Sequence, residues 1–314
     1  MSGGEERRPA VLDGGLAVEG PRDQRDVHRF SHEAMATIFE IYAFHADRQY
    51  AAQAAQSAFE LVDRLELELS RFVTNSDISR INRLAAGEST RVTPTTLECL
   101  LIARHMFDLT GGAFDVSIGT GLPLLDFDGG SYLVRSRATG VRVDLGGIGK
   151  GYAVDLVAEL LQEWGIHQAL VHGGFSSVLA LDPAPGYGDG WPLTLSDPKT
   201  PSRVLARLSA RQTSLGASGL RKGDHIADPR TGQPVRGRAA AWVALPRPQP
   251  DPGRTPGEQG PRLAAAAVTD ALTTAFMLLS QEEIERLCAS SPGLEAWILP
   301  EPPTAGLLHF GSSL

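Results

Sequence analysis

The chain has 314 residues but only two cysteines, Cys99 and Cys288, and neither lies in a CxxC pair or beside a cluster of histidines. Such sparse cysteines argue against both a disulfide framework and a zinc site. Positive charge is also in the minority, because 29 Lys and Arg stand against 37 Asp and Glu and give a net charge of −8. Without a basic field to hold a phosphate backbone, no nucleic-acid partner is expected.

Long apolar runs are missing as well. No stretch approaches the roughly 18 apolar residues of a membrane span. Residues 1–30 also lack the run of about 7–15 apolar residues that a signal peptide requires. No cysteine stands near the N-terminus to accept a lipid. We therefore expect no membrane span and no export by the general secretory route.

The remaining composition is typical of a folded globular protein, with 42% hydrophobic and 21% charged residues. Residues 1–29 mix charge, Gly and Pro without periodicity, which predicts a disordered tail. We expect residues 30–314 to form one compact body. It should carry a surface excursion at 246–262, where Pro and Gly are too frequent for regular structure.

Apolar periodicity predicts strands and helices mixed along this body. The expected strands are 37–44, 141–145, 191–195, 203–209, 239–245 and 295–299, with further strand pattern within 167–181. The expected helices are 49–70, 93–109, 152–164, 263–279 and 281–290, with a short helical turn near 75–82. Thr93 followed by Pro94 is typical of a helix start, and Gly111-Gly112 of a helix end.

A glycine-rich loop at 144–151, with the sequence DLGGIGKG, follows a predicted strand and precedes a predicted helix. At such a place backbone N–H groups and the helix dipole can hold a phosphate, and Lys150 adds a positive charge. The spacing matches neither the Walker loop nor the dinucleotide fingerprint, which argues against ordinary NTPase and nicotinamide chemistry. The local pattern leaves a phosphate site and a structural tight turn equally open.

A polar segment at 224–234 contains Asp-Pro and Thr-Gly steps, which are turn signals and favour a hairpin. His225 sits there between Asp224 and Asp228. Neighbouring carboxylates can orient a histidine and raise its basicity, as a general base requires. A catalytic histidine and a solvated structural turn are both compatible with this pattern.

Asp270 and Thr274 are spaced i, i+4 near the start of the predicted helix 263–279, which puts a carboxylate and a hydroxyl on one helix face. Hard oxygen ligands of this kind suit Mg²⁺. The alternative is that Asp270 caps the helix and Thr274 bonds back to a carbonyl. A further segment, 111–115, presents Phe114 and Asp115 after a helix, either to hold a planar ligand or to complete a cap.

Taken together and in this order, these segments resemble the ApbE-like flavin transferase family, the FAD:protein FMN transferases. The similarity runs from about Met35 to Leu279. The blocks that carry it are MATIF at 35–39, LSRF at 69–72 with SRIN at 79–82, GAFD at 112–115, DLGGIGKGYAVD at 144–155, SG at 218–219, HIADPRTG at 225–232 and TDALTT at 269–274.

The resemblance implies an α+β fold, a single compact body with mixed or antiparallel sheets, packed helices and a T-fold-like part. It also implies a reaction in which the FMN moiety of FAD is transferred, with Mg²⁺, to a Thr or Ser hydroxyl of an acceptor flavoprotein, releasing AMP. FAD would be the substrate, Mg²⁺ the cofactor, and a flavoprotein with a Thr/Ser flavinylation motif the partner.

The same resemblance assigns the site residue by residue. The implied metal ligands are the Gly147 carbonyl and the side chains of Asp270 and Thr274. The implied FAD contacts are Met35, Phe72, Ala113, Phe114, Asp115, Asp144, Lys150 and Ala227. His225 is our candidate to remove the proton of the acceptor hydroxyl, since a hydroxyl needs a nearby base as it becomes a nucleophile.

The chain departs from the family pattern at three places. Phe175 stands where many members carry Asp, His172 stands where Asn is common, and the stretch between Gly219 and His225 is short. The short stretch keeps open a Mg²⁺-dependent FAD pyrophosphatase giving FMN and AMP, and Phe175 keeps open a non-catalytic flavin-binding protein. Many members are exported lipoproteins, whereas this chain lacks signal and N-terminal Cys, so we expect a cytoplasmic form or another export route.

Overall fold

The computed structural model describes residues 16–18, 26–174, 176–219, 227–248, 264–302 and 306–311. The strands are β1 (Leu16–Val18), β2 (Val27–Ala34), β3 (Thr37–Phe44), β4 (Ser89–Arg91), β5 (Leu125–Asp128), β6 (Leu133–Ser136), β7 (Ala169–Gly173), β8 (Ser177–Ala180), β9 (Trp191–Ser196), β10 (Val204–Ala210), β11 (Thr213–Gly219), β12 (Arg238–Pro246), β13 (Glu295–Pro300) and β14 (Leu308–Phe310). The helices are α1 (Arg48–Leu69), α2 (Asp77–Ile81), α3 (Pro94–Leu109), α4 (Gly149–Glu163), α5 (Ala265–Phe276) and α6 (Gln281–Ser290), with a 3₁₀ turn at Leu122–Leu124.

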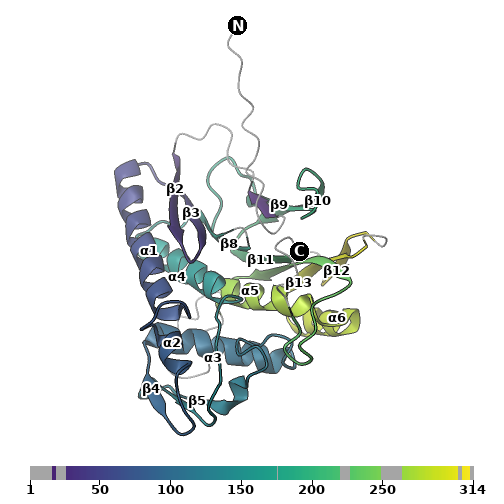
Figure 1. Ribbon diagram of the computed structural model, residues 1–314. Coiled ribbons are helices and arrows are strands. Elements are labelled where there is room, and N and C mark those ends of the chain that lie inside the picture. The colour runs from purple at the N-terminus through teal and green to yellow at the C-terminus, as the bar shows by residue number, and fades with distance from the viewer. Residues whose placement is uncertain are drawn as a thin grey trace.

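An eight-stranded antiparallel sheet in the order β14-β13-β12-β11-β8-β7-β3-β2 forms the centre of the molecule. Helices α4 and α5 pack on one of its faces, and α1 lies beside them against β2 and β3 (Figure 1). Two three-stranded sheets, β1-β9-β10 and β4-β6-β5, complete the fold. This mixture of antiparallel sheets and packed helices confirms the predicted fold class.

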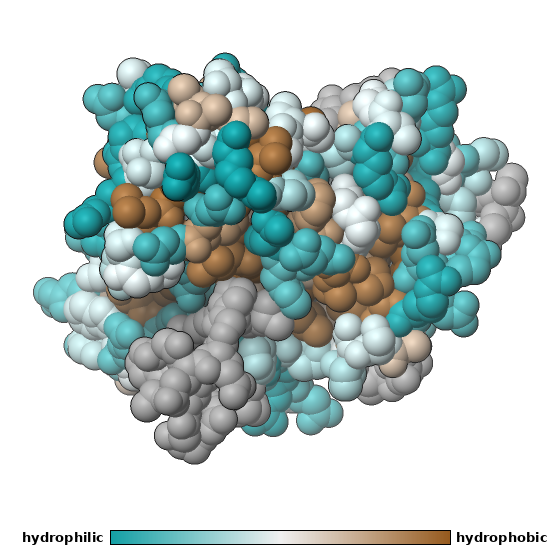
Figure 2. Space-filling view, turned by 90° about the horizontal axis from the view of Figure 1, so that it is seen from below, coloured by the Kyte–Doolittle hydropathy of each residue, from teal (hydrophilic) through white to brown (hydrophobic). Residues whose placement is uncertain are grey.

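The central strands bury both of their faces, because a hydrophobic core lies on each side of the large sheet. In β12, Ala241 and Val243 belong to the core beneath the helices, whereas Trp242 belongs to the second core under the sheet β1-β9-β10. Alternate residues of a strand point to opposite faces, so a strand covered on both sides reads as a continuous apolar run. Seen from below, the outer surface is mostly hydrophilic with a few hydrophobic areas (Figure 2).

Side-chain caps fix the starts of two long helices. The Asp47 carboxylate accepts the N–H groups of Gln49 and Tyr50 at the start of α1, and Thr93 caps α3 ahead of Pro94. Side-chain oxygens at these positions satisfy N–H groups that have no partner inside the helix. The predicted helices 49–70, 93–109 and 281–290 are confirmed to within one residue.

Two strands were not foreseen at the N-terminal end, where residues 1–29 were predicted to form a tail. β2 already begins at Val27, and Leu16–Val18 pairs with β9. The pairing extends the small sheet at an edge whose backbone groups would otherwise lack partners. No helix among the described residues is both long and apolar enough to cross a bilayer.

Strand β11 was missed because its sequence, TSLGASG, has a single β-branched residue, Thr213, and no aromatic residue. The packing of α5 explains that composition. A Cβ atom on Gly216 would lie 2.7 Å from the Thr269 carbonyl oxygen of α5. The strand therefore carries small residues where the helix backbone lies directly against it.

Helix α5 is also held against α4 by two features of α4. A Cβ atom on Gly151 would lie 2.1 Å from the carbonyl oxygen of Ala266, so only glycine permits this approach. One turn later, the buried Asp155 carboxylate accepts the N–H groups of Ala266 and Ala267 at 3.0 and 2.8 Å. No side-chain cap comes from the N-cap residue of α5, Ala264. Asp155 therefore supplies the cap of α5 from a neighbouring helix.

Gly151→Ala is expected to destabilise the protein by about 1–3 kcal/mol, because the added methyl group has no space between the helices. Helix propensity alone predicts the opposite sign, since Ala is favoured over Gly within a helix by roughly 0.5–1 kcal/mol. Urea unfolding measures the difference. Gly129→Ala is the matched control, because nothing lies within 4 Å of a Cβ atom at exposed Gly129. A Gly151→Ala protein as stable as wild type would contradict this helix packing.

The Asp155 carboxyl predicts a pH dependence of stability. Burial raises its pKa from 3.8 to about 7, against the opposing effect of the hydrogen bonds from Ala266 and Ala267. The folded state therefore keeps a proton that the unfolded chain releases, so this group lowers the free energy of unfolding as pH rises from about 4 to about 7. Asp155→Asn should flatten the curve in that window, as measured by urea unfolding against pH. Asp126→Asn, in an exposed ion pair, controls for net charge. Identical slopes for Asp155→Asn and wild type would contradict the assignment.

Candidate functional site

Three segments meet at the buried side chain of Asp270, which is 3% exposed on α5. Its Oδ2 accepts the Gly151 N–H at 3.0 Å, and its Oδ1 accepts the Ser177 hydroxyl at 2.9 Å. The Lys150 ammonium lies 3.8 Å from Oδ2. The carboxylate thus joins the start of α4, the start of β8 and the middle of α5.

Burial raises the pKa of Asp270, and the nearby Lys150 charge with the Ser177 and Gly151 hydrogen bonds opposes that rise. These contacts therefore compensate only part of the cost of burying the negative charge. A cation bound beside the carboxylate would favour its ionised form. Asp270 lies in the middle of α5, so it does not cap the helix, as the structural alternative required.

Gly147 of the glycine loop lies beside Thr274, which is on the same helix as Asp270. Thr274 follows Asp270 by one turn, and its hydroxyl lies 3.5 Å from the Asp270 carbonyl oxygen, at the limit of a hydrogen bond. A Cβ atom on Gly147 would lie 3.6 Å from Thr274 Oγ1 and 3.3 Å from Phe114 Cε2. The glycine loop therefore packs closely on Thr274 and on the Phe114 ring.

The donor atoms of these groups are all oxygens, the ligands that a hard cation prefers. Asp270, Thr274 and the Gly147 carbonyl offer one carboxylate, one hydroxyl and one carbonyl oxygen. Within the described part of the chain, no group of three or more His, Cys, Asp or Glu side chains is arranged to hold a metal. A single carboxylate with neutral oxygens fits Mg²⁺, which usually takes one or two carboxylates and fills its other positions with water and substrate phosphate.

The segment 141–145 was predicted to be a strand, and this prediction is wrong. None of its residues belongs to a strand. The Asn82 side chain takes the place of a neighbouring strand, since its Oδ1 accepts Val143 N–H at 2.6 Å and its Nδ2 donates to Val143 O at 2.9 Å. Asp144 N–H donates to Val116 O at 2.7 Å. A side-chain amide offers the same donor and acceptor as a backbone, which sequence periodicity does not reveal.

The glycine loop itself is a hydrogen-bonded turn. Most of its N–H groups donate within the protein: Gly146 to Asp144 Oδ1, Ile148 and Gly149 to Leu145 O, and Gly151 to Asp270. The Lys150 ammonium donates to the Gly146 carbonyl at 3.1 Å. The loop therefore offers an anionic ligand chiefly the charge of Lys150.

Asp144 and Phe72 are linked through Arg71. The Arg71 Nε lies 2.7 Å from Asp144 Oδ2, and the Arg71 guanidinium carbon lies 4.2 Å from the centre of the Phe72 ring. Phe72 is 79% exposed. No role for Arg71 could be predicted from the sequence, because its partner Asp144 is distant in the chain.

The loop with Ala113, Phe114 and Asp115 is built around the Asp115 carboxylate. Asp115 accepts the Ser117 N–H and hydroxyl at 2.8 and 2.7 Å and the Gly119 N–H at 2.9 Å. Ala113 and Phe114 are buried at 1% and 3% exposure. Asp115 therefore organises the loop, and Phe114 reaches the glycine loop from the core.

Met35 lies at the tip of the β2–β3 hairpin, where Met35 and Ala36 have φ angles of 50° and 56°. The next residue, Thr37, lies against the turn after β7, since a Cβ atom on Gly174 would be 2.4 Å from its hydroxyl oxygen. Met35 is partly buried against the main core. The hairpin tip thus borders the β7–β8 turn that leads to Ser177.

His225 and Asp224 lie outside the described residues, whereas the turn after them is described. Ala227 is exposed and forms an isolated antiparallel β-bridge with Pro234. The Asp228 carboxylate binds Arg230 through two contacts of 2.9 and 2.8 Å, and this pair holds the pKa of Asp228 below its usual value. The negative charge of Asp228 is therefore paired with Arg230, which reduces the rise in basicity that Asp228 was expected to give His225.

This turn packs on the Asp115 loop. A Cβ atom on Gly119 would lie 2.5 Å from the Pro229 carbonyl oxygen, and one on Gly112 would lie 3.9 Å from the Arg230 side chain. The φ angles of both glycines are positive, at 76° and 78°. Two segments that the sequence singled out separately are therefore in direct contact.

His172, which stands where Asn is common in the family, pairs with a buried glutamate. His172 is 1% exposed, and its Nε2 lies 2.8 Å from Glu40 Oε2 on the paired strand β3. Burial raises the pKa of Glu40, but hydrogen bonds from His172 and Arg29 outweigh it and hold that pKa below its usual value. Phe175 lies outside the described residues.

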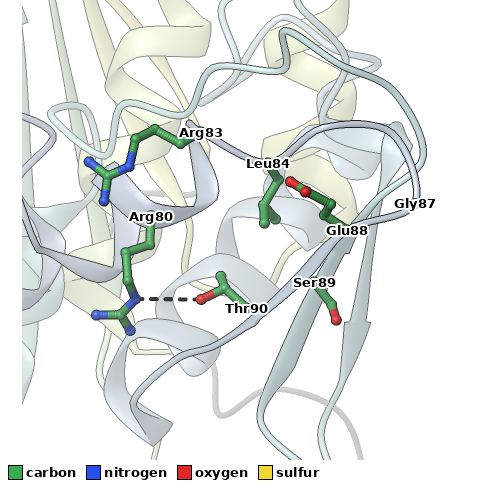
Figure 3. Close-up of a pocket in the computed structure, with 7 residues that line it drawn as sticks. All are labelled: Arg80, Arg83, Leu84, Gly87, Glu88, Ser89 and Thr90. Carbon is green, nitrogen blue, oxygen red and sulfur yellow. Dashed lines mark hydrogen bonds between the residues drawn. The ribbon is translucent and has the colours of Figure 1, made fainter.

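A cavity of about 510 Å³ lies elsewhere, between α2 and β4. Its lining residues are Arg80, Arg83, Leu84, Gly87, Glu88, Ser89 and Thr90 (Figure 3). Arg80 is used structurally, since it binds Asp77 at 2.5 Å and the Arg91 carbonyl at 2.8 Å. None of the predicted site residues lines this cavity, so we do not place the site there.

Comparison with known proteins gives consistent matches. The model of the ApbE family matches residues 35–138 and 125–249, which together span more than half of the chain. A protein of Vibrio cholerae named FAD:protein FMN transferase is 23% identical, with 84% of each chain covered. One of the same name from Treponema pallidum is 26% identical, covering 79% of this chain and 77% of that protein.

Solved structures share the fold. The flavin transferase ApbE of Vibrio cholerae aligns with a TM-score of 0.75 at 21% identity, over 91% of this chain and 97% of that chain. The ApbE protein of Thermotoga maritima aligns with a TM-score of 0.74 at 21% identity, over 90% and 97%. The resemblance recognised in the sequence is confirmed, and the chain belongs to the ApbE family.

Proposed function

We propose that this chain transfers the FMN moiety of FAD to a Thr or Ser hydroxyl of an acceptor flavoprotein, with Mg²⁺ as cofactor and AMP as the other product. The observation that carries the proposal is the meeting of Asp270, Thr274 and Gly147 beside the Lys150 ammonium. The names of the relatives from Vibrio cholerae and Treponema pallidum support the same reaction.

Asp270, Thr274 and the Gly147 carbonyl would hold Mg²⁺, which when bound neutralises charge on the pyrophosphate oxygens as the phosphorus–oxygen bond breaks. Lys150 adds a second positive charge at the same place. The Ser177 hydroxyl and the Gly151 N–H fix the Asp270 carboxylate, so its charge is already oriented before substrate arrives. A preorganised site of this kind favours the charge distribution of the transition state.

Phe72, Asp144, Lys150 and Met35 are proposed to contact FAD, with Ala113, Phe114, Asp115 and Ala227 along the adjoining loop and turn. Phe72 offers an exposed ring face, and Asp144 retains acceptor capacity beside its Arg71 and Gly146 contacts. His225 is proposed as the base that takes the proton of the acceptor hydroxyl as it attacks phosphorus. It precedes a turn that is packed on the Asp115 loop.

Asp270→Asn should lower covalent FMN transfer by at least about 100-fold, because the loss of a charged metal ligand removes several kcal/mol of charge stabilisation. FAD binding should weaken much less, since that charge acts mainly in the transition state. The substrate is a flavoprotein domain with an Asp-Gly-x-x-Thr/Ser motif, and the readouts are adduct mass and AMP release. Asp126→Asn is the control. Unchanged AMP release by folded Asp270→Asn protein would contradict the metal assignment.

His225→Asn tests the proposed base. Transfer should fall by about 10²–10⁴-fold, the usual scale of general base catalysis, while folding and FAD affinity stay near wild type. Adduct formation is followed by mass spectrometry, and the unfolding midpoint reports any structural role. Adduct formation near the wild-type rate would exclude His225 as the base.

The wild-type protein distinguishes the transferase from a FAD pyrophosphatase. AMP release at full rate without acceptor, and unaffected by adding one, would identify a FAD pyrophosphatase.

A further inference from the structure

Arg71 contacts two residues that stand far apart in the sequence and that are both proposed to bind FAD. Its Nε forms an ion pair with Asp144 at 2.7 Å, and its guanidinium lies over the Phe72 ring at 4.2 Å from the centroid. The Asp144 carboxylate also accepts the Gly146 N–H at 2.9 Å. Arg71 therefore links the aromatic ring after α1 to the glycine loop before α4.

Phe72 has the largest exposed fraction, 79%, among the exposed large hydrophobic side chains of the described residues. Because the Phe72 ring is exposed to water, it contributes little hydrophobic stabilisation, and its contact with an exposed guanidinium adds little more. Arg71 covers one face of the ring. The other face is suited to stack on a planar heteroaromatic group such as the rings of FAD.

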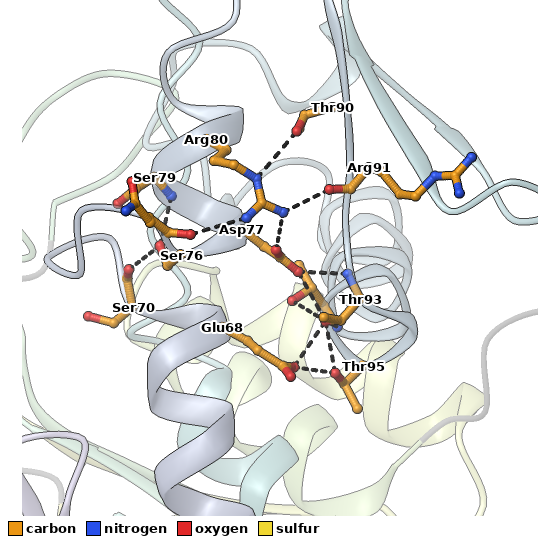
Figure 4. A network of polar contacts seen from close by, with 12 residues as sticks. Glu68, Ser70, Ser76, Asp77, Ser79, Arg80, Thr90, Arg91, Thr93 and Thr95 are labelled. Carbon is orange, nitrogen blue, oxygen red and sulfur yellow. Dashed lines mark hydrogen bonds and ion pairs between the residues drawn. The ribbon is translucent and has the colours of Figure 1, made fainter.

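The backbone of this segment is fixed without the Arg71 side chain. The Ser76 hydroxyl donates to the Ser70 carbonyl at 2.6 Å, and the Ser79 hydroxyl donates to the Arg71 carbonyl at 3.1 Å. Figure 4 shows these serines within a polar network that joins the end of α1 to α2, β4 and the start of α3. Substitution of Arg71 should therefore change how Phe72 and Asp144 are held while the loop stays in place.

Stability alone does not account for the Arg71–Asp144 pair. The two side chains are 45% and 30% exposed, and ion pairs at such positions contribute little to folding because water screens them. The planar guanidinium can stack and donate hydrogen bonds at the same time, which an ammonium cannot do. The arrangement thus uses the geometry of arginine as well as its charge.

We propose that Arg71 is a positioning residue that holds the Phe72 ring and the Asp144 carboxylate in the arrangement that binds FAD. The inference rests on the proposed function, because it takes FAD as the ligand of this site. Arg71 acts on substrate affinity through its two neighbours. It takes no part in the transfer of the FMN group, so affinity and turnover should respond separately to its substitution.

The experiment compares Arg71→Gln and Arg71→Lys with wild type. FAD affinity is measured by the change in flavin fluorescence on binding, and KM and kcat are measured for transfer to the acceptor domain. Both variants should bind FAD about 5- to 30-fold more weakly, with KM raised and kcat nearly unchanged. Arg71→Gln loses the charge that pairs with Asp144, and Arg71→Lys keeps the charge but loses the planar group that stacks on Phe72 while it pairs with Asp144. The fluorescence change of bound FAD should also be smaller in both.

Arg137→Gln is the matched control, because Arg137 also forms an exposed ion pair with an aspartate, Asp126, at 3.4 Å. It should bind FAD as wild type does. Full FAD affinity in Arg71→Lys would show that charge alone suffices and would overturn the inference, as would full affinity in Arg71→Gln. Wild-type protein that binds no FAD would overturn the proposed function together with this inference.

Discussion

Helix α4 crosses α5 with Gly151 so close to Ala266 that no side chain fits between them. That approach brings the Gly151 N–H to the Asp270 carboxylate and places Lys150 within 3.8 Å of it. Asp155 reinforces the crossing by capping α5 from the side. The relative positions of Asp270 and Lys150 therefore depend on one close contact between α4 and α5, which is possible because Gly151 has no side chain.

The same helix contact surrounds a carboxylate whose negative charge is only partly compensated. Asp270 is buried, and desolvation raises its pKa despite the Lys150 charge and two hydrogen bonds. A protein gains nothing in stability from such a carboxylate unless a cation or a proton satisfies it. Thr274 and the Gly147 carbonyl can complete a set of oxygen ligands around such a cation. The packing of the helices thereby supports the Mg²⁺-dependent chemistry proposed for this chain.

Much of this arrangement could be predicted from the sequence. Local signals placed α1, α3 and α6, because capping residues and apolar spacing act within a few residues of one another. The i, i+4 spacing of Asp270 and Thr274 correctly put them on one helix face, because both lie within α5. The resemblance to a family then supplied roles that spacing alone left undecided between a ligand and a cap.

The parts that could not be predicted depend on contacts between distant residues. Asn82 replaces a strand for Val143, and Ser177 and Arg71 orient two carboxylates, Asp270 and Asp144, that come much later in the chain. Strand β11 is poor in typical strand residues because α5 leaves no room for them. No local pattern encodes such partners, so sequence reasoning found the acids but not the groups that hold them.

The central claim is that Asp270, Thr274 and the Gly147 carbonyl together bind a divalent cation beside the Lys150 charge. The most direct measurement is the anomalous diffraction of crystals of the wild-type protein soaked with Mn²⁺ and FAD, in which Mn²⁺ stands in for Mg²⁺. The account predicts one strong peak at about 2.0–2.3 Å from oxygens of these three residues. A Mn²⁺ peak with FAD bound but without Asp270 among its ligands would contradict it.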